Sequence, residues 1–219
     1  LYYYAQPFSG KVTITDMNLE TSSIQVLDAE GYDKSDIKKA GLPEENLLWK
    51  EASCAYGLLQ DGSYRIMAQA DDILHNAVTE EGLLTVYSDI MIVDTKRPKI
   101  TLTMTDGSGQ VYETYGDKFF AQDMTAHLTI EDKNLDLSTV VVSITGRTAD
   151  GEAFYDELPT EAWEKTGDVY TAGYLFTEEG QYRILVSCMD FAGNEAEKAG
   201  ESFAIDKTIP VVEVVFDNN

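Results

Sequence analysis

The sequence predicts an all-β protein made of two tandem antiparallel β-sandwiches with short helical insertions. Residues 182–188 (YRILVSC) alternate between inward and outward side chains, which is typical of a half-buried strand. Residues 62–66 (GSYRI) return as 180–184 (GQYRI), so the chain contains a repeat. Helix-forming stretches are short and few, so sheets must supply most of the core.

The repeat extends upstream and downstream of this match. Residues 11–19 (KVTITDMNL) correspond to 127–135 (HLTIEDKNL), and residues 94–98 (DTKRP) correspond to 206–210 (DKTIP). Matching blocks in one order, with small drifts in spacing, indicate a duplicated unit of roughly 115 residues. That length is typical of one β-sandwich domain.

We therefore expect one domain over residues 1–97 and a second over 98–209. The first lacks a counterpart of the predicted opening strand 99–104. Residues 210–219 (PVVEVVFDNN) resemble 98–107 (PKITLTMTDG), which indicates the start of a truncated third repeat. We expect the chain to be an internal piece of a longer polypeptide. Its tail should be loose or added as a strand to a neighbouring molecule.

In the first repeat, strands are expected at 11–16, 22–27, 51–58, 63–71 and 84–93. Residues 33–40 (DKSDIKKA) break the alternation. An Asp that can cap their start and Gly41 at their end predict a short helix there. Residues 43–49 form a connector with a helical turn. Residues 73–84 exceed the matching hairpin of the second repeat and predict a bulge or an extended loop.

In the second repeat, strands are expected at 99–104, 111–112, 126–131, 139–145, 153–155, 170–176, 181–189 and 201–205. Residues 153–155 are short enough to form an edge strand. Pro159 suits the first position of a helix, so residues 159–163 (PTEAW) predict a single helical turn.

Composition excludes several classes of function. The chain carries 39 acidic and 16 basic residues and a net charge of −23. Nucleic acids and anionic membrane surfaces are bound through basic surfaces, so neither is an expected partner. No apolar run is long enough to cross a membrane, so no membrane insertion is expected.

The two cysteines are expected to be free thiols. Cys188 shares the inward face of its strand with Ile184, and Cys54 shares a face with Ala52 and Tyr56. Each cysteine therefore lies in the core of a different repeat, and a disulfide would have to bridge two cores.

Several motifs resemble bacterial immunoglobulin-like (Big-type) domains over nearly the whole chain. Residues 61–64 (DGSY) and 179–182 (EGQY) resemble the turn before strand F. Residues 190–194 (DFAGN) resemble the hairpin of these modules, and 206–210 (DKTIP) resemble the short exit that joins them. In the first repeat, 72–76 (DILHN) lacks the Ala-Gly pair, so we expect a remodelled hairpin.

The resemblance implies structural roles for residues in both turns. Tyr64 and Tyr182 would form the tyrosine corner, with the hydroxyl bonding back to the preceding loop. Gly62 and Gly180 would start the strand from a tight turn, which positive φ angles allow. Ile66 and Ile184 occupy the place of the strand F cysteine, so no intersheet disulfide is implied.

The sequence predicts no metal or cofactor site, and the main alternative is a Ca²⁺ site. Asp190, Asn194 and Asp206 offer oxygen ligands. Asp16 with Asn18 and Asp132 with Asn134 offer further pairs at strand ends. Calcium requires six to eight oxygens at one point, and no spacing matches a dedicated calcium loop. Turn capping by these Asp and Asn side chains is the favoured interpretation.

Five aromatic residues could stack on sugar rings: Tyr2, Tyr3, Tyr4, Trp49 and Trp163. Trp49 and Trp163 recur at equivalent places in the two repeats. Recurrence favours core packing, because a binding site is more often particular to one repeat. The histidines, His75 in a turn and His127 on a polar strand face, form no catalytic or metal-binding motif.

No motif indicates an enzyme. The resemblance implies a non-catalytic spacer, stalk or adhesin module of a Gram-positive cell-surface protein, located outside the cell. Its partners would be adjacent domains of the same polypeptide. Two alternatives stay open: a module that binds glycan or host protein, and an accessory domain of a secreted polysaccharide-degrading enzyme. For the binding alternative, residues 33–40 and 73–84 are the first places to examine.

Overall fold

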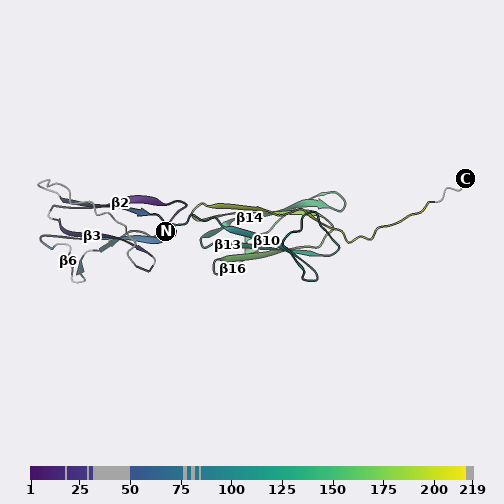
Figure 1. The fold of residues 1–219 in the computed structure, drawn as a ribbon, viewed down its shortest axis with the longest axis horizontal. Helices are drawn as coiled ribbons and strands as arrows, with labels where there is room; N and C mark the ends of the chain where they lie inside the picture. Colours follow the sequence, from purple (N-terminus) through teal and green to yellow (C-terminus); the bar gives the residue numbers. More distant parts are fainter. Residues whose placement is uncertain are drawn as a thin grey trace. The chain divides into compact units, whose positions relative to one another are not determined.

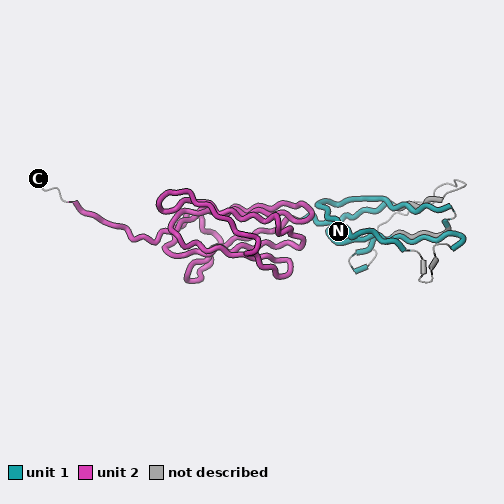
Figure 2. The backbone as a smooth tube through the Cα atoms, turned by 180° about the vertical axis from the view of Figure 1, so that it is seen from behind, with its two compact units in different colours: residues 1–96 teal, residues 97–219 magenta. Residues whose placement is uncertain are grey.

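The computed structural model describes residues 1–17, 19–28, 30–31, 50–75, 78–79, 82–83 and 85–215. The chain divides into two compact units, Leu1–Lys96 and Arg97–Asn219, which Figure 2 distinguishes by colour. The expected helix 33–40, the connector 43–49 and Trp49 lie outside the described residues. The regular elements described in the two units are strands, apart from one 3-10 helix in unit 2, which confirms the predicted all-β fold.

Unit 2 is a sandwich of two sheets (Figure 1). The first sheet has the order β11 (Val111–Tyr112), β10 (Lys99–Asp106), β13 (Met124–Glu131), β17 (Val169–Phe176) and β16 (Glu164–Thr166). The second has the order β12 (Phe119–Phe120), β20 (Phe203–Ile205), β18 (Gly180–Asp190), β14 (Leu135–Thr148) and β15 (Ala153–Glu157). The strand β19 (Glu195–Ala199) also pairs with β18.

The core of unit 2 lies between these sheets. Along β18, buried and exposed residues alternate as the sequence predicts, with Tyr182, Ile184, Val186 and Cys188 inward. Inward residues of β13 meet them from the other sheet, and Met124, Ala126, Leu128 and Ile130 are at most 1% exposed. The predicted helical turn is the 3-10 helix η1 (Thr160–Ala162).

Unit 1 has the same plan with fewer described strands. One sheet has the order β1 (Tyr2–Tyr4), β9 (Met91–Val93), β5 (Gly62–Asp72) and β3 (Leu19–Asp28), and β8 (Thr85–Tyr87) also pairs with β5. The strands β2 (Phe8–Asp16) and β4 (Lys50–Leu58) form the opposing pair. The expected extended loop contains a small hairpin of β6 (Val78–Thr79) and β7 (Gly82–Leu83).

The buried core described in unit 1 consists of Val26, Leu58, Ile66, Met91 and Val93. Aromatic side chains close it from one side, where the rings of Tyr4 and Phe8 stack with their centroids 4.0 Å apart. In β2, the inward positions Val12 and Ile14 are only half-buried.

The tail that follows β20 is extended and exposed. Ile209, Val211, Val212, Val214 and Val215 are each at least 67% exposed, and residues 210–215 pair with no described strand. Phe216 and the last three residues lie outside the described part. Residues 210–215 therefore add no strand to the sheets of unit 2.

Candidate functional site

The clearest recurring polar feature of both units lies where the chain leaves the last strand. We call it the exit clamp, defined as Asp61 with Thr95 and Lys96 in unit 1, and Glu179 with Lys207 and Thr208 in unit 2. In each unit the carboxylate belongs to the turn before the long central strand, β5 or β18. Folding brings it to the exit because β9 and β20 pair with the first residues of these strands.

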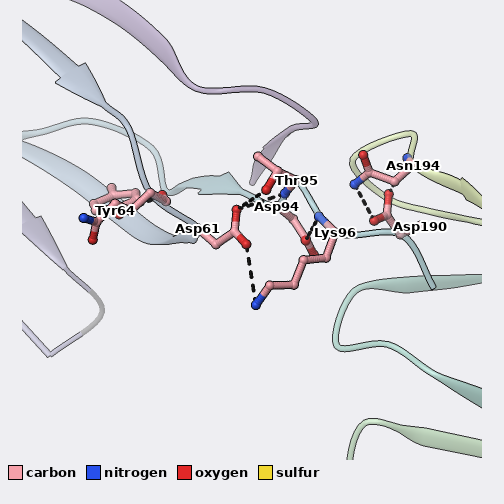
Figure 3. A network of polar contacts seen from close by, with 8 residues as sticks. Asp61, Tyr64, Asp94, Thr95, Lys96, Asp190 and Asn194 are labelled. Atoms are coloured by element: carbon pink, nitrogen blue, oxygen red, sulfur yellow. Dashed lines mark hydrogen bonds and ion pairs between the residues drawn. The ribbon is translucent and has the colours of Figure 1, made fainter. Parts of the chain in front are cut away.

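In unit 1 the Asp61 carboxylate holds the exit by three contacts (Figure 3). Its Oδ1 accepts hydrogen bonds from the Thr95 backbone N–H at 3.0 Å and from the Thr95 hydroxyl at 2.8 Å. Its Oδ2 lies 3.7 Å from the Lys96 ammonium. The hydroxyl hydrogen bond is the main cause that lowers the pKa of Asp61 below its usual value. The carboxylate is therefore held in its charged form.

In unit 2 Glu179 does the same with a longer side chain. Its Oε1 accepts from the Lys207 backbone N–H at 2.6 Å, and both carboxylate oxygens accept from the Thr208 hydroxyl at 2.9 and 2.8 Å. The Lys207 ammonium donates to Asp123 Oδ1 at 2.5 Å and to the Thr177 carbonyl at 2.6 Å. The Lys207 side chain therefore ties the exit of unit 2 to two further loops, through the side chain of Asp123 and the backbone of Thr177.

A turn and a parallel strand pair complete each exit. Asp94 Oδ1 accepts from the Lys96 backbone N–H, and Asp206 Oδ1 accepts from the Thr208 N–H, both at 3.1 Å. The backbone N–H of Asp94 donates to Tyr4 O at 3.0 Å, and that of Asp206 donates to Phe120 O at 2.9 Å. Short side-chain turns of this kind favour one backbone conformation over many. Both exits are thus ordered within their own units.

The tyrosines named for the corner lie beside the clamps. Tyr64 Oη donates to the Gln60 carbonyl at 2.9 Å, and Tyr182 Oη donates to the Glu178 carbonyl at 3.1 Å. These bonds tie each turn to its long strand. Each clamp carboxylate sits in the turn that this bond closes.

The expectation that Gly180 uses a positive φ angle is wrong, because neither Gly180 nor its counterpart Gly62 adopts one. Glycine is needed at both positions because the neighbouring atoms leave no room for a Cβ. A Cβ on Gly180 would lie 2.5 Å from the Arg147 carbonyl oxygen and 3.0 Å from Tyr182 Oη. A Cβ on Gly62 would lie 3.0 Å from Tyr64 Oη. Because glycine has no Cβ, the tyrosine two residues later can fold back over the turn.

Of the calcium candidates, Asp190 and Asn194 lie together, whereas Asp206 lies at the other end of the long strand. Asp190 ends β18, whereas Asp206 follows β20, which pairs with the start of β18. A strand of this length separates them by about 30 Å at roughly 3.3 Å per residue. Asp190 is 1% exposed and accepts from both the backbone N–H and the side-chain amide of Asn194, each at 2.8 Å (Figure 3). These contacts cap the hairpin turn.

A different carboxylate, Asp132, lies beside Asp190. Ligand oxygens of the two residues are within 4.8 Å of each other, and Asp132 is 8% exposed. Asp132 Oδ1 also accepts from the Asn134 backbone N–H at 2.7 Å. Both carboxylates add to the effect of burial, which raises the pKa of the Cys188 thiol to about 11.

The other predicted residues have structural surroundings. Trp163 is 8% exposed and belongs to the core of unit 2. His127 lies on the exposed face of β13 with Nε2 at 2.7 Å from the Thr105 hydroxyl oxygen. Cys188 is buried and free, whereas the side chain of Cys54 lies outside the described part. Tyr2 is exposed at 55%.

The exit clamp was missed at the sequence level, although its signal was present. Asp61 and Glu179 stand at the same place in the aligned repeats, directly before the Gly-x-Tyr motif. The position is acidic in both repeats, with Asp in the first and Glu in the second. Its partners lie about 30 residues away, so only the strand pairing reveals them.

No family model and no curated protein matches this chain. Comparison with solved structures finds similarity to the fibronectin(III)-like modules of CbhA from Clostridium thermocellum. The match covers 93% of this chain and 86% of that chain at 15% identity, with a TM-score of 0.27. The sandwich assignment therefore rests on the strand pairing described above. Among the described residues, no helix is long and apolar enough to span a membrane.

Proposed function

We propose that the chain is a non-catalytic, immunoglobulin-like spacer or adhesin module of a bacterial cell-surface protein. It would hold a neighbouring domain of the same polypeptide at a distance from the cell wall. The observation that carries the proposal is the recurrence of the exit clamp. A spacer needs each module to pass the chain on in a fixed direction, and each unit orders its own exit within itself.

The interior of unit 2 is consistent with this role. Its core is filled with interdigitating apolar and aromatic side chains, such as Phe176, Tyr182 and Phe203, whose ring centroids lie 5.0 to 5.9 Å apart. The buried Asp190 is used in turn capping. A bacterial Big-type assignment and a place on a Gram-positive surface are parts of the proposal that rest on sequence resemblance. An accessory domain of a polysaccharide-degrading enzyme would also need ordered exits, because it would have to hold the catalytic domain in place.

The proposal is tested by backbone NMR relaxation on the intact chain. We expect the amides of Thr95, Lys207 and Thr208 to show order parameters near 0.85, like the strands. The tail 211–215 should fall below about 0.6. Replacing Glu179 by Ala should bring Lys207 and Thr208 toward the values of the tail, because the Lys207 N–H and the Thr208 hydroxyl lose their common acceptor.

Glu178→Ala is the matched control, since Glu178 is adjacent and exposed and its side chain takes no part in the clamp. It should leave the exit amides unchanged. Exit amides that are already as mobile as the tail in the unaltered chain would remove the basis of the spacer proposal.

A further inference from the structure

A hollow of about 350 Å³ lies on unit 2, along the strands β14 and β18. Arg147 and Arg183 line it together with the polar side chains of Thr145, Gln181 and Ser202. In the antiparallel register, Thr145 is opposite Arg183 and Arg147 is opposite Gln181. The two arginines are therefore diagonal neighbours on the outer face of this sheet, within reach of one small ligand.

Both guanidinium groups are anchored by backbone oxygens. Arg147 Nη1 donates to the Gly151 carbonyl at 3.0 Å, and Arg183 Nε donates to the Gly200 carbonyl at 3.3 Å. Each arginine has five N–H donors, so most of them remain for other partners. Neither arginine forms an ion pair with any carboxylate in the described part of the chain. This is unexpected in a protein with 39 acidic and 16 basic residues.

On the strand beside the hollow, an exposed aromatic ring offers a surface for a sugar ring. Tyr155 in β15 is opposite Thr145 and is 62% exposed. Its hydroxyl donates to the neighbouring Glu157, which limits the rotation of the ring. An exposed aromatic ring beside hydroxyl and amide groups provides both a stacking face and hydrogen-bond partners.

The corresponding place in unit 1 is built differently. Arg65 aligns with Arg183, but its guanidinium lies over the ring of Tyr87, with Cζ 4.7 Å from the centroid. The residue opposite Arg65 is Leu27, where unit 2 has Thr145. The arrangement is thus present in one repeat only. This is expected of a binding site, whereas a feature that stabilises the fold would recur in both repeats.

We propose that this hollow binds the oxyanion, carboxylate or sulfate, of an acidic polysaccharide. Arginine presents a planar fork that matches such groups and is the common choice for recognising them. The net charge of −23 does not prevent this, because the Debye length at physiological ionic strength is only about 8 Å. Charges beyond that distance are largely screened, so the two guanidinium groups can attract an anion into the hollow although the whole chain is acidic.

The test measures binding of the intact chain to three polymers in about 150 mM salt. Polygalacturonate carries carboxylates, dextran sulfate carries sulfates, and dextran is the uncharged reference. Isothermal titration should detect binding to at least one acidic polymer and none to dextran. Binding to polygalacturonate alone identifies a carboxylate ligand, and binding to dextran sulfate alone identifies a sulfate ligand.

The variants Arg147→Gln and Arg183→Gln should each raise the dissociation constant about tenfold or more, because each removes a charge-assisted hydrogen bond. Arg65→Gln is the matched control and should leave it unchanged. Thermal unfolding checks that the variants remain folded, as expected for exposed side chains. The proposal is overturned if neither acidic polymer binds, or if Arg65→Gln weakens binding as much as Arg183→Gln does. A spacer with ordered exits would survive that result.

Discussion

The strands β2 and β13 occupy the same place in the two units, yet their inward residues are buried to different extents. In unit 2, β13 lies between β10 and β17, and its inward residues Leu128 and Ile130 are 1% and 0% exposed. In unit 1 the only described neighbour of β2 is β4, and the matching Val12 and Ile14 are half-buried. The same alternation of residues therefore yields a full core only where a strand equivalent to β10 is present.

Truncation of these matched inward residues should give the largest difference between the units. Leu128→Ala should lower the free energy of unfolding of unit 2 by about 2–5 kcal/mol, because it leaves a cavity in a closed core. Val12→Ala should cost unit 1 only about 1 kcal/mol, since its side chain is already partly in water. Urea unfolding followed by NMR signals of each unit measures both losses separately.

The outward neighbours serve as controls for this comparison. Thr13→Ala and Thr129→Ala change the same two strands on the opposite face and should stay within about 0.5 kcal/mol. Equal losses for Leu128→Ala and Val12→Ala would mean that β2 is as well enclosed as β13 in solution.

The units should also differ in their response to alkali. Burial raises the pKa of Cys188 from 9.0 to about 11 and that of Tyr115 from 10.0 to about 12. Both groups ionise first in the unfolded chain, so their contribution is complete below pH 9 and declines between about pH 9 and 12. In unit 1, burial also raises the pKa of Tyr56. We therefore expect the free energy of unfolding to fall more steeply with rising pH in unit 2 than in unit 1.

Denaturant midpoints of each unit from pH 8 to pH 12 measure this loss. Cys188→Ala should flatten the part of the unit 2 profile between about pH 9 and pH 11, whatever its effect at pH 8. An unchanged slope in the variant would show that the thiol ionises alike in the folded and unfolded chains.

Much of the fold could be predicted from the sequence because period-two alternation and internal repetition are local signals. The strand 111–112, the edge strand that begins at Ala153 and the single turn near Pro159 all appear. The exit clamps and the arginine hollow could not be predicted. Their parts come from segments about 30 to 60 residues apart, and only the pairing register places them together.

The calcium candidates failed for the same physical reason. Asp190 and Asp206 are 16 residues apart in the sequence, but the antiparallel return of β20 places them at opposite ends of β18. Sequence spacing alone does not tell which end of a strand a residue faces. A carboxylate that does approach Asp190 is that of Asp132, which lies 58 residues upstream.

The smallest expected effects concern the hairpin that follows each long strand. Both units have a residue with a positive φ angle there, but the residue type differs. Gly193 adopts a φ angle of 92°, and His75, at the matching position of unit 1, adopts 56°. A residue with a Cβ is disfavoured there by roughly 1–2 kcal/mol. His75 gains a compensating contact, since its Nδ1 lies 2.6 Å from Asp71 Oδ2. The residue that matches Asp71 in unit 2 is Met189, which cannot form this contact.

Exchange of the two residues should therefore have unequal effects. His75→Gly relieves the backbone and loses the contact with Asp71, so the free energy of unfolding of unit 1 should change by less than about 0.5 kcal/mol. Gly193→His gains no carboxylate partner and should cost unit 2 about 1–2 kcal/mol. In the double variant Gly193→His with Met189→Asp, part of that loss should return, because the Asp restores the partner four residues upstream. If the added Asp recovers nothing, the tolerance of His75 comes from the looser packing of unit 1 and not from its contact with Asp71.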